Sequence, residues 1–140
     1  MADVSARTRS GPGRILIAVY AIFALAATAR SAVQLATKFG EAPLAYLLSA
    51  FAAVVYIVAT VCLARGSRTS RRVATVSIVV ELIGVLTIGT LSLVDPQAFP
   101  DATVWSAYGQ GYGYVPLVLP VLGLWWLRRT APAGGQGVDR

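Results

Sequence analysis

The stretch "APLAYLLSAFAAVVYIVATVCLA", residues Ala42–Ala64, is 23 residues long and carries no charged side chain. A helix of about 20 apolar residues can cross the roughly 30 Å hydrocarbon core of a bilayer. In lipid, a helix also satisfies its backbone donors and acceptors within its own segment. We therefore predict that residues 42–64 form a transmembrane helix, and the rest of the chain can be interpreted outward from it.

The composition of the whole chain agrees with a lipid environment. Of its 140 residues, 56% are hydrophobic and 13% are charged, whereas soluble domains have about 45–50% apolar and about 25% charged residues. A chain this short buries too small a share of its surface to hide so much apolar area from water. The lipid bilayer is therefore the first expected partner. The net charge of +6 does not indicate nucleic-acid binding, because the arginines lie at the ends of apolar runs.

Two further apolar segments are long enough to span. Val73–Val94 has 22 residues and one charge, Glu81. The first segment is apolar over Ile15–Ala29, is then interrupted by Arg30, and continues to Phe39. Its arginine-rich flank and the "ATA" before Arg30 are also typical of a cleaved signal peptide. That alternative stays open, although the later spans favour an uncleaved signal anchor.

The fourth apolar run, Tyr114–Leu127, is the least regular. Its 14 residues would cover only about 21 Å as a helix, which is too short to cross. Part of the preceding segment, Ala102–Gly113, must therefore enter the membrane.

Residues 111–113 of that segment read Gly-Tyr-Gly, the centre of a potassium-channel filter. Such a filter needs a preceding Thr-Val pair and four copies around one axis. Here Gly109 and Gln110 precede the motif, and no aspartate follows it. The pattern therefore argues against a pore loop.

The favoured interpretation is a helix over residues 102–127, capped by Asp101. Its 26 residues would span about 39 Å, enough to cross with tilt. Prolines remove helical donors and would kink it, while two glycines four residues apart would let a neighbouring backbone approach. The remaining alternative is a broken helix that lines a polar pocket. The residues expected to pack or kink this helix are Gly109, Gly113, Pro116 and Pro120.

The basic residues gather at alternate ends of the four segments, which predicts the topology through the positive-inside rule. We predict an all-α, antiparallel four-helix transmembrane bundle in the cell (inner) membrane, with both termini cytoplasmic. Residues 1–14 would form a basic tail, residues 15–129 the membrane domain, and residues 130–140 a disordered tail. The expected spans are about 15–39, 42–64, 73–94 and 102–127. The basic residues expected in the cytoplasm include Arg7, Arg9, Arg14, Arg65, Arg68, Arg71, Arg72, Arg128 and Arg129.

Glu81 is the most informative polar residue, because a charge inside the membrane costs roughly 2.5–3.5 kcal/mol on insertion scales. It must be neutral, paired or exposed to a wet cavity. Arg30 is a candidate partner, although its backbone would lie about 10 Å nearer the outer face. Gln34 and Lys38 follow Arg30 at four-residue steps. This polar stripe either snorkels to the outer headgroups or forms a pocket with Glu81. The candidate intramembrane polar site is therefore Glu81, Arg30 and Gln34.

Small residues recur every four or five positions in three of the segments. Ordinary helix packing explains such ridges, and a surface reserved for a partner protein is the functional alternative. The ridges are Ala24, Thr28, Ala32 and Ala36; Ala45, Ser49 and Ala53; and Gly84 with Gly89.

The chain has no histidine and one cysteine, Cys62, so a Cys/His metal site and a Ser-His-Asp triad are excluded. We expect no catalytic site, no metal site and no cofactor. The leading hypothesis is a non-enzymatic accessory or interaction subunit of an inner-membrane assembly, partnered by other membrane proteins or by its own copies. The alternative is a small oligomeric carrier or proton-coupled transporter that uses Glu81. An enzyme acting on lipid is a distant third, because three polar residues make a thin constellation.

The runs "YAIFALAATARSAVQLATKFGEAPLAYLLSAFAAVVYIVATVCLA" and "FPDATVWSAYGQGYGYVPLVLPVLGLWWL" resemble small four-span conserved integral membrane proteins of high-GC Gram-positive bacteria. That group has no assigned activity, so the resemblance implies location and span number only. The chain is also similar in size and span number to small multidrug-resistance transporters. Their essential glutamate lies in the first span, whereas Glu81 lies in the third.

Overall fold

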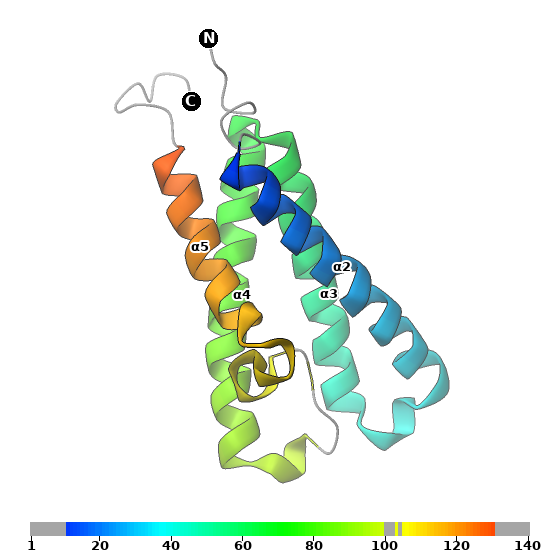
Figure 1. The fold of residues 1–140 in the computed structure, drawn as a ribbon. Helices are drawn as coiled ribbons and strands as arrows, with labels where there is room; N and C mark the ends of the chain where they lie inside the picture. The colour runs from blue at the N-terminus through cyan, green and yellow to red at the C-terminus, as the bar shows by residue number, and fades with distance from the viewer. Residues whose placement is uncertain (1–10, 100–102, 104, 131–140) are drawn as a thin grey trace.

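The computed structural model describes residues 11–99, 103 and 105–130, and within these ranges the chain is helical with no strand. The shape is an elongated bundle (Figure 1). The elements are α2 (Pro12–Thr37), η1 (Phe39–Glu41), α3 (Pro43–Arg65), α4 (Arg68–Val94), η2 (Pro96–Ala98), η3 (Ser106–Tyr112) and α5 (Val115–Arg129). Among the described residues, 3₁₀ segments lie between α2 and α3 and between α4 and α5, and a two-residue turn, Gly66–Ser67, joins α3 to α4.

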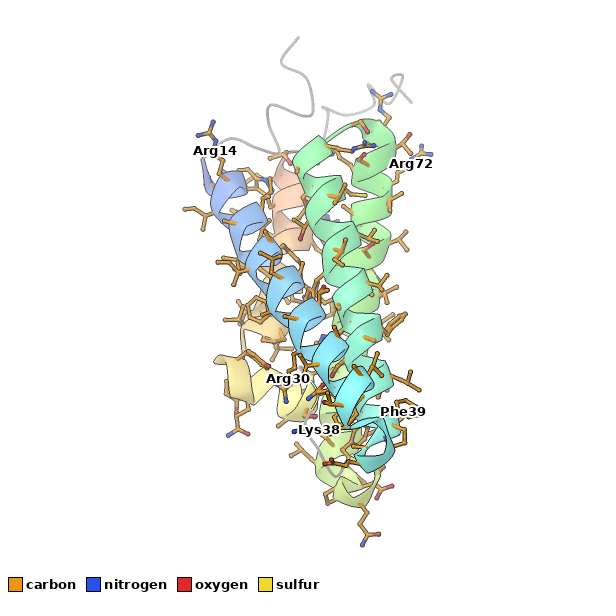
Figure 2. The ribbon with its side chains drawn as sticks, turned by 90° about the vertical axis from the view of Figure 1, so that its right-hand side faces the viewer. Arg14, Arg30, Lys38, Phe39 and Arg72 are labelled. Atoms are coloured by element: carbon orange, nitrogen blue, oxygen red, sulfur yellow. The ribbon has the colours of Figure 1, made fainter. Side chains whose placement is uncertain are left out.

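Successive helices run in alternate directions, so the first and last described residues lie at the same end of the bundle (Figure 1). Arg14 and Arg72 mark that end, and Lys38 and Phe39 mark the other (Figure 2). The end formed by the start of α2, the α3–α4 turn and the close of α5 is called the arginine end below.

Three of the described helices, α2, α3 and α4, are long and apolar enough to cross a membrane. They correspond to the first three predicted spans with shifted ends: α2 stops at Thr37, before the predicted Phe39, and α3 runs over Pro43–Arg65 instead of 42–64. α2 begins at Pro12 rather than Ile15, because proline suits the first turn of a helix, where its missing N–H has no partner. α4 begins at Arg68 rather than Val73, since the Ser67 hydroxyl accepts from the Ser70 amide and caps it. Of the tails predicted over 1–14 and 130–140, residues 1–10 and 131–140 lie outside the described residues. The prediction is wrong for Pro12–Arg14, which form the first turn of α2.

The predicted fourth helix is wrong over its first half, because α5 begins at Val115 and not at Ala102. Ala107, Tyr108 and Tyr114 have φ angles of 49°, 62° and 62°, and such left-handed residues cannot continue a right-handed helix. Asp101, the predicted cap, lies outside the described residues. The 15 residues of α5 cover about 22 Å, so a fourth crossing remains a prediction.

The segment before α5, residues 105–114, is called the irregular segment below, and it packs against glycines of α4. A Cβ built on Gly84 would lie 2.6 Å from the Trp105 ring, and one on Gly89 would lie 2.8 Å from the Tyr108 amide nitrogen. These glycines therefore receive the 3₁₀ segment rather than a neighbouring helix. Ser92 Oγ accepts from the Ala107 amide at 2.8 Å. Such side-chain partners are needed because irregular backbone in a bilayer must be satisfied by protein.

The small-residue ridges have different fates on α2 and α3. Ala45, Ser49 and Ala53 are buried, as predicted, and α2 is buried along Tyr20, Ala24, Ala27, Ser31 and Gln34. Thr28, Ala32 and Ala36 are exposed. Most of the predicted α2 ridge therefore points away from the other helices of the bundle. A strict four-residue step turns by about 40° per step in a helix of 3.6 residues per turn, which carries the ridge off the buried face.

Candidate functional site

The candidate site is centred on Glu81, halfway along α4. Its side chain is 0% exposed. The Tyr20 hydroxyl on α2 donates a hydrogen bond of 2.7 Å to Glu81 Oε1. Glu81 Oε2 has no hydrogen-bond partner among the described residues. One oxygen of the buried carboxyl group is thus held by a neutral donor, whereas the other is buried without a hydrogen bond from the described residues.

Aromatic side chains from two other parts of the chain complete the surroundings of this pair. The Tyr20 and Tyr56 ring centroids are 6.2 Å apart, which brings α3 to the site. The Trp105 Nε1–H donates to the Tyr56 hydroxyl at 3.1 Å. Buried tyrosine and tryptophan usually place their polar atoms on such partners. The irregular segment and α3 are therefore linked beside Glu81 by one hydrogen bond.

Gly123 lets α5 approach the same centre. A Cβ at this position would lie 3.2 Å from the Tyr20 hydroxyl oxygen and 3.0 Å from Ile78 Cδ1. Because glycine has no side chain, Gly123 allows α5 to lie close to Tyr20 and Ile78. As a result, α2, α3, α4 and α5 all contribute to the walls around Glu81.

Arg30, the predicted partner of Glu81, is engaged elsewhere. Its Nη1 donates to the Tyr112 hydroxyl in η3. Tyr20, which does reach Glu81, precedes Arg30 by ten residues, or about 15 Å along α2. The offset along the helix axes that the sequence predicts between Arg30 and Glu81 is therefore large enough to keep the two side chains apart. The direct pair does not form.

The predicted polar stripe on α2 divides into three environments. Lys38 is exposed at the end opposite the arginines (Figure 2). Arg30 is half-buried and reaches η3, whereas Gln34 is only 7% exposed. Snorkelling can describe Lys38, but Gln34 lies inside the bundle and belongs to a second polar cluster.

That second cluster lies between α2 and α3, nearer the end that carries Lys38. Gln34 Oε1, Ser31 Oγ and Ser49 Oγ are buried and have no hydrogen-bond partner among the described residues. A cavity of about 10 Å³ is lined by Arg30, Ser49 and Tyr112, together with apolar side chains. This volume admits about one water molecule, which could supply hydrogen bonds to part of the cluster.

Of the residues predicted to shape the fourth helix, the two glycines lie before α5 and the two prolines lie within it. Gly109 has a φ of 85°, and a Cβ there would lie 2.7 Å from the Pro116 ring. Gly113 also has a positive φ, of 65°, but its surroundings are open. Pro116 occupies the first turn of α5 and Pro120 lies in its interior. The two glycines therefore form the turn that precedes the helix, and the predicted kink remains a prediction.

Sequence reasoning missed Tyr20, Tyr56 and Trp105. The available signal was a phenol or indole in an otherwise apolar segment, since a buried hydroxyl or N–H requires a partner. Tyr20 and Tyr56 both lie well inside predicted spans rather than at their ends.

Within the described ranges, no group of three His, Cys, Asp or Glu side chains is placed to hold a metal ion. Comparisons of the chain with protein families, with curated proteins and with solved structures found no match.

Proposed function

We propose that this chain is a four-span, non-enzymatic protein of the cell membrane that acts as an accessory subunit by binding another membrane protein through α2. The observation that carries the proposal is the row of small residues that α2 leaves uncovered. Thr28, Ala32 and Ala36 are exposed, although small residues on membrane helices favour close approach of a second helix. Lipid chains pack poorly against a surface of short side chains. A partner helix at this row would make closer van der Waals contacts with α2 than lipid does.

The α3 ridge shows how such packing works within the chain. Ala45, Ser49 and Ala53 are buried on the helix that packs most extensively against α2. The same α2 helix therefore uses one face for α3, and its row of small residues is available for a partner. This pattern supports an interaction subunit more directly than an enzyme or a carrier.

The test is co-purification in mild detergent, followed by substitution on the uncovered row. We expect a stoichiometric foreign membrane protein to accompany the chain and Ala32→Phe to remove it. Val76→Phe is the matched control, because Val76 is 63% exposed on a different helix. Equal loss of the partner in both variants, or purification of the chain alone, would contradict the proposal.

A second candidate, a small oligomeric proton-coupled carrier, is favoured by the Glu81 site. The buried Glu81 Oε2 has no partner among the described residues, and ionisable groups inside membranes often mark proton pathways. Arg30 and Gln34 would contribute through the neighbouring polar cluster. Proton flux in liposomes that Glu81→Gln abolishes would support this carrier. The accessory-subunit proposal expects no flux and normal partner binding by Glu81→Gln.

The proposed location rests on the distribution of charge. The arginine end contains Arg14, Arg72 and Arg128, and the positive-inside rule would place it in the cytoplasm. The resemblance to small membrane proteins of high-GC Gram-positive bacteria agrees with this location and assigns no activity.

A further inference from the structure

A cavity of about 510 Å³ lies at the arginine end, between the first turns of α4 and the last turns of α5. Its volume is within the range of about 300–1,000 Å³ typical of small-molecule sites. Four arginines and one threonine line it, together with two leucines, and most of its lining surface is apolar. The lining residues are Arg68, Arg71, Arg72, Thr75, Leu124, Leu127 and Arg128.

The electrostatics of this cavity favour an anion. It lies at the N-terminus of α4, where the helix dipole is positive and a negative charge is stabilised. The first turn of α4 nevertheless contains no acidic residue, and no acidic side chain is among the described residues that line the cavity. Guanidinium groups match phosphate oxygens through paired N–H donors. The cavity is therefore suited to a phosphate group.

The apolar wall indicates that the phosphate is part of a lipid. Leu124 and Leu127 lie on α5, toward the middle of the bundle from Arg128. Leu127 belongs to the hydrophobic core and Leu124 packs against it, yet both also border the cavity. An inorganic ion would make no use of this apolar wall, whereas a lipid would place its phosphate among the arginines and its acyl chain along the leucines. Basic pockets between membrane helices near the bilayer surface bind anionic headgroups in this manner.

Arg71 is the arginine of this cavity that is held in place by the protein. It is only 7% exposed, and its Nη2 donates to the Leu127 carbonyl oxygen and, at 3.0 Å, to Thr130 Oγ1. These bonds attach the end of α5 to the start of α4. Arg72 and Arg128 are exposed and can turn toward a ligand. We propose that this cavity binds the phosphate of an anionic phospholipid, and this inference does not depend on the proposed function.

The test measures lipid binding by the full chain in a neutral detergent, by native mass spectrometry and by the shift in melting temperature. The three probes are phosphatidylglycerol, phosphatidylcholine and inorganic phosphate. The test variant combines Arg68→Gln, Arg72→Gln and Arg128→Gln. The matched control combines Arg14→Gln, Arg65→Gln and Arg129→Gln, which removes the same charge from the same end without altering the cavity lining.

We expect the wild-type chain to prefer phosphatidylglycerol and to be stabilised by it. The test variant should lose about tenfold or more in affinity, and the control less than about threefold, because charges outside the cavity contribute only a general surface attraction. Equal losses in both variants, equal binding of phosphatidylcholine, or equal stabilisation by inorganic phosphate would each overturn the proposal. If the triple variant fails to fold, Arg72→Gln and Arg128→Gln are measured singly against Arg129→Gln. A loss no greater than that of Arg129→Gln would then overturn it.

Discussion

The Trp105 indole lies directly over Gly84, where a Cβ would come within 2.6 Å of ring atom Cζ3. On its other side the indole N–H donates to the Tyr56 hydroxyl at 3.1 Å. One side chain from the irregular segment is thus held between α4 and α3, beside the buried Glu81. This contact explains how a non-helical segment can be fixed inside a bundle of apolar helices.

Gly84→Ala should destabilise the fold, because the added methyl group overlaps the Trp105 ring. Overpacking of this kind costs about 1–3 kcal/mol. The melting temperature in detergent measures it. Gly111→Ala is the control, since nothing lies within 4 Å of a Cβ at Gly111. An unchanged melting temperature for Gly84→Ala would show that the indole does not pack against this glycine.

Tyr20→Phe should also destabilise the fold. It removes the hydroxyl that donates to Glu81 Oε1 and leaves a buried acceptor unsatisfied, at a cost of about 1–3 kcal/mol. Tyr114→Phe should have little effect, because Tyr114 is 46% exposed. Denaturant titration of both variants in the same detergent makes the comparison. Equal stability of the two variants would contradict the importance of the Tyr20–Glu81 bond.

The apolar spans could be predicted from the sequence, because their length and lack of charge have few alternatives in lipid. The course of residues 105–114 could not, because it depends on tertiary contacts. Trp105 needs the space above Gly84, and the Ala107 amide needs the Ser92 hydroxyl. Neither requirement leaves a periodic signal in the sequence.

The candidate site was predicted in part, for a related reason. Glu81 was identifiable from its cost in a membrane, but its partner depends on helix register. Tyr20 and Arg30 are ten residues apart on the same helix, and register decided which of them reaches Glu81. The hydrogen bond from Tyr20 to Glu81 shows that Tyr20 lies level with the carboxyl group. Arg30, ten residues further along α2, therefore lies beside η3 instead.

Gly109 and Gly113 should respond differently to alanine, although both have positive φ angles. Gly113→Ala introduces only a left-handed alanine, which costs about 1–2 kcal/mol. Gly109→Ala adds to this strain an overlap with the Pro116 ring, so its melting temperature should fall further. The two variants serve as each other's control. A larger loss for Gly113→Ala would contradict the close contact between Gly109 and Pro116.

Arg71→Gln should loosen the end of α5. The substitution shortens the side chain and removes the hydrogen bonds to the Leu127 carbonyl and the Thr130 hydroxyl. Amide hydrogen exchange over residues 124–130 should accelerate by about tenfold, since a charged hydrogen bond contributes about 1.5–3 kcal/mol. Arg129→Gln is the control, because its guanidinium lies over the exposed Trp125 ring. Equal acceleration in both variants would show that Arg71 does not hold α5.

The arrangement of the two ends predicts opposite labelling of two introduced cysteines. Thr69 lies in the first turn of α4 at the arginine end, and Gly40 lies in η1 at the opposite end; both are exposed. With Cys62→Ala as background, Gly40→Cys should react with a membrane-impermeant maleimide in intact cells, and Thr69→Cys only after the cells are permeabilised. The reason is that arginine-rich loops remain on the cytoplasmic side during insertion. Labelling of Thr69→Cys from outside would reverse the proposed orientation. Recovery of the chain in a carbonate-washed soluble fraction would instead show that lipid does not surround α2, α3 and α4.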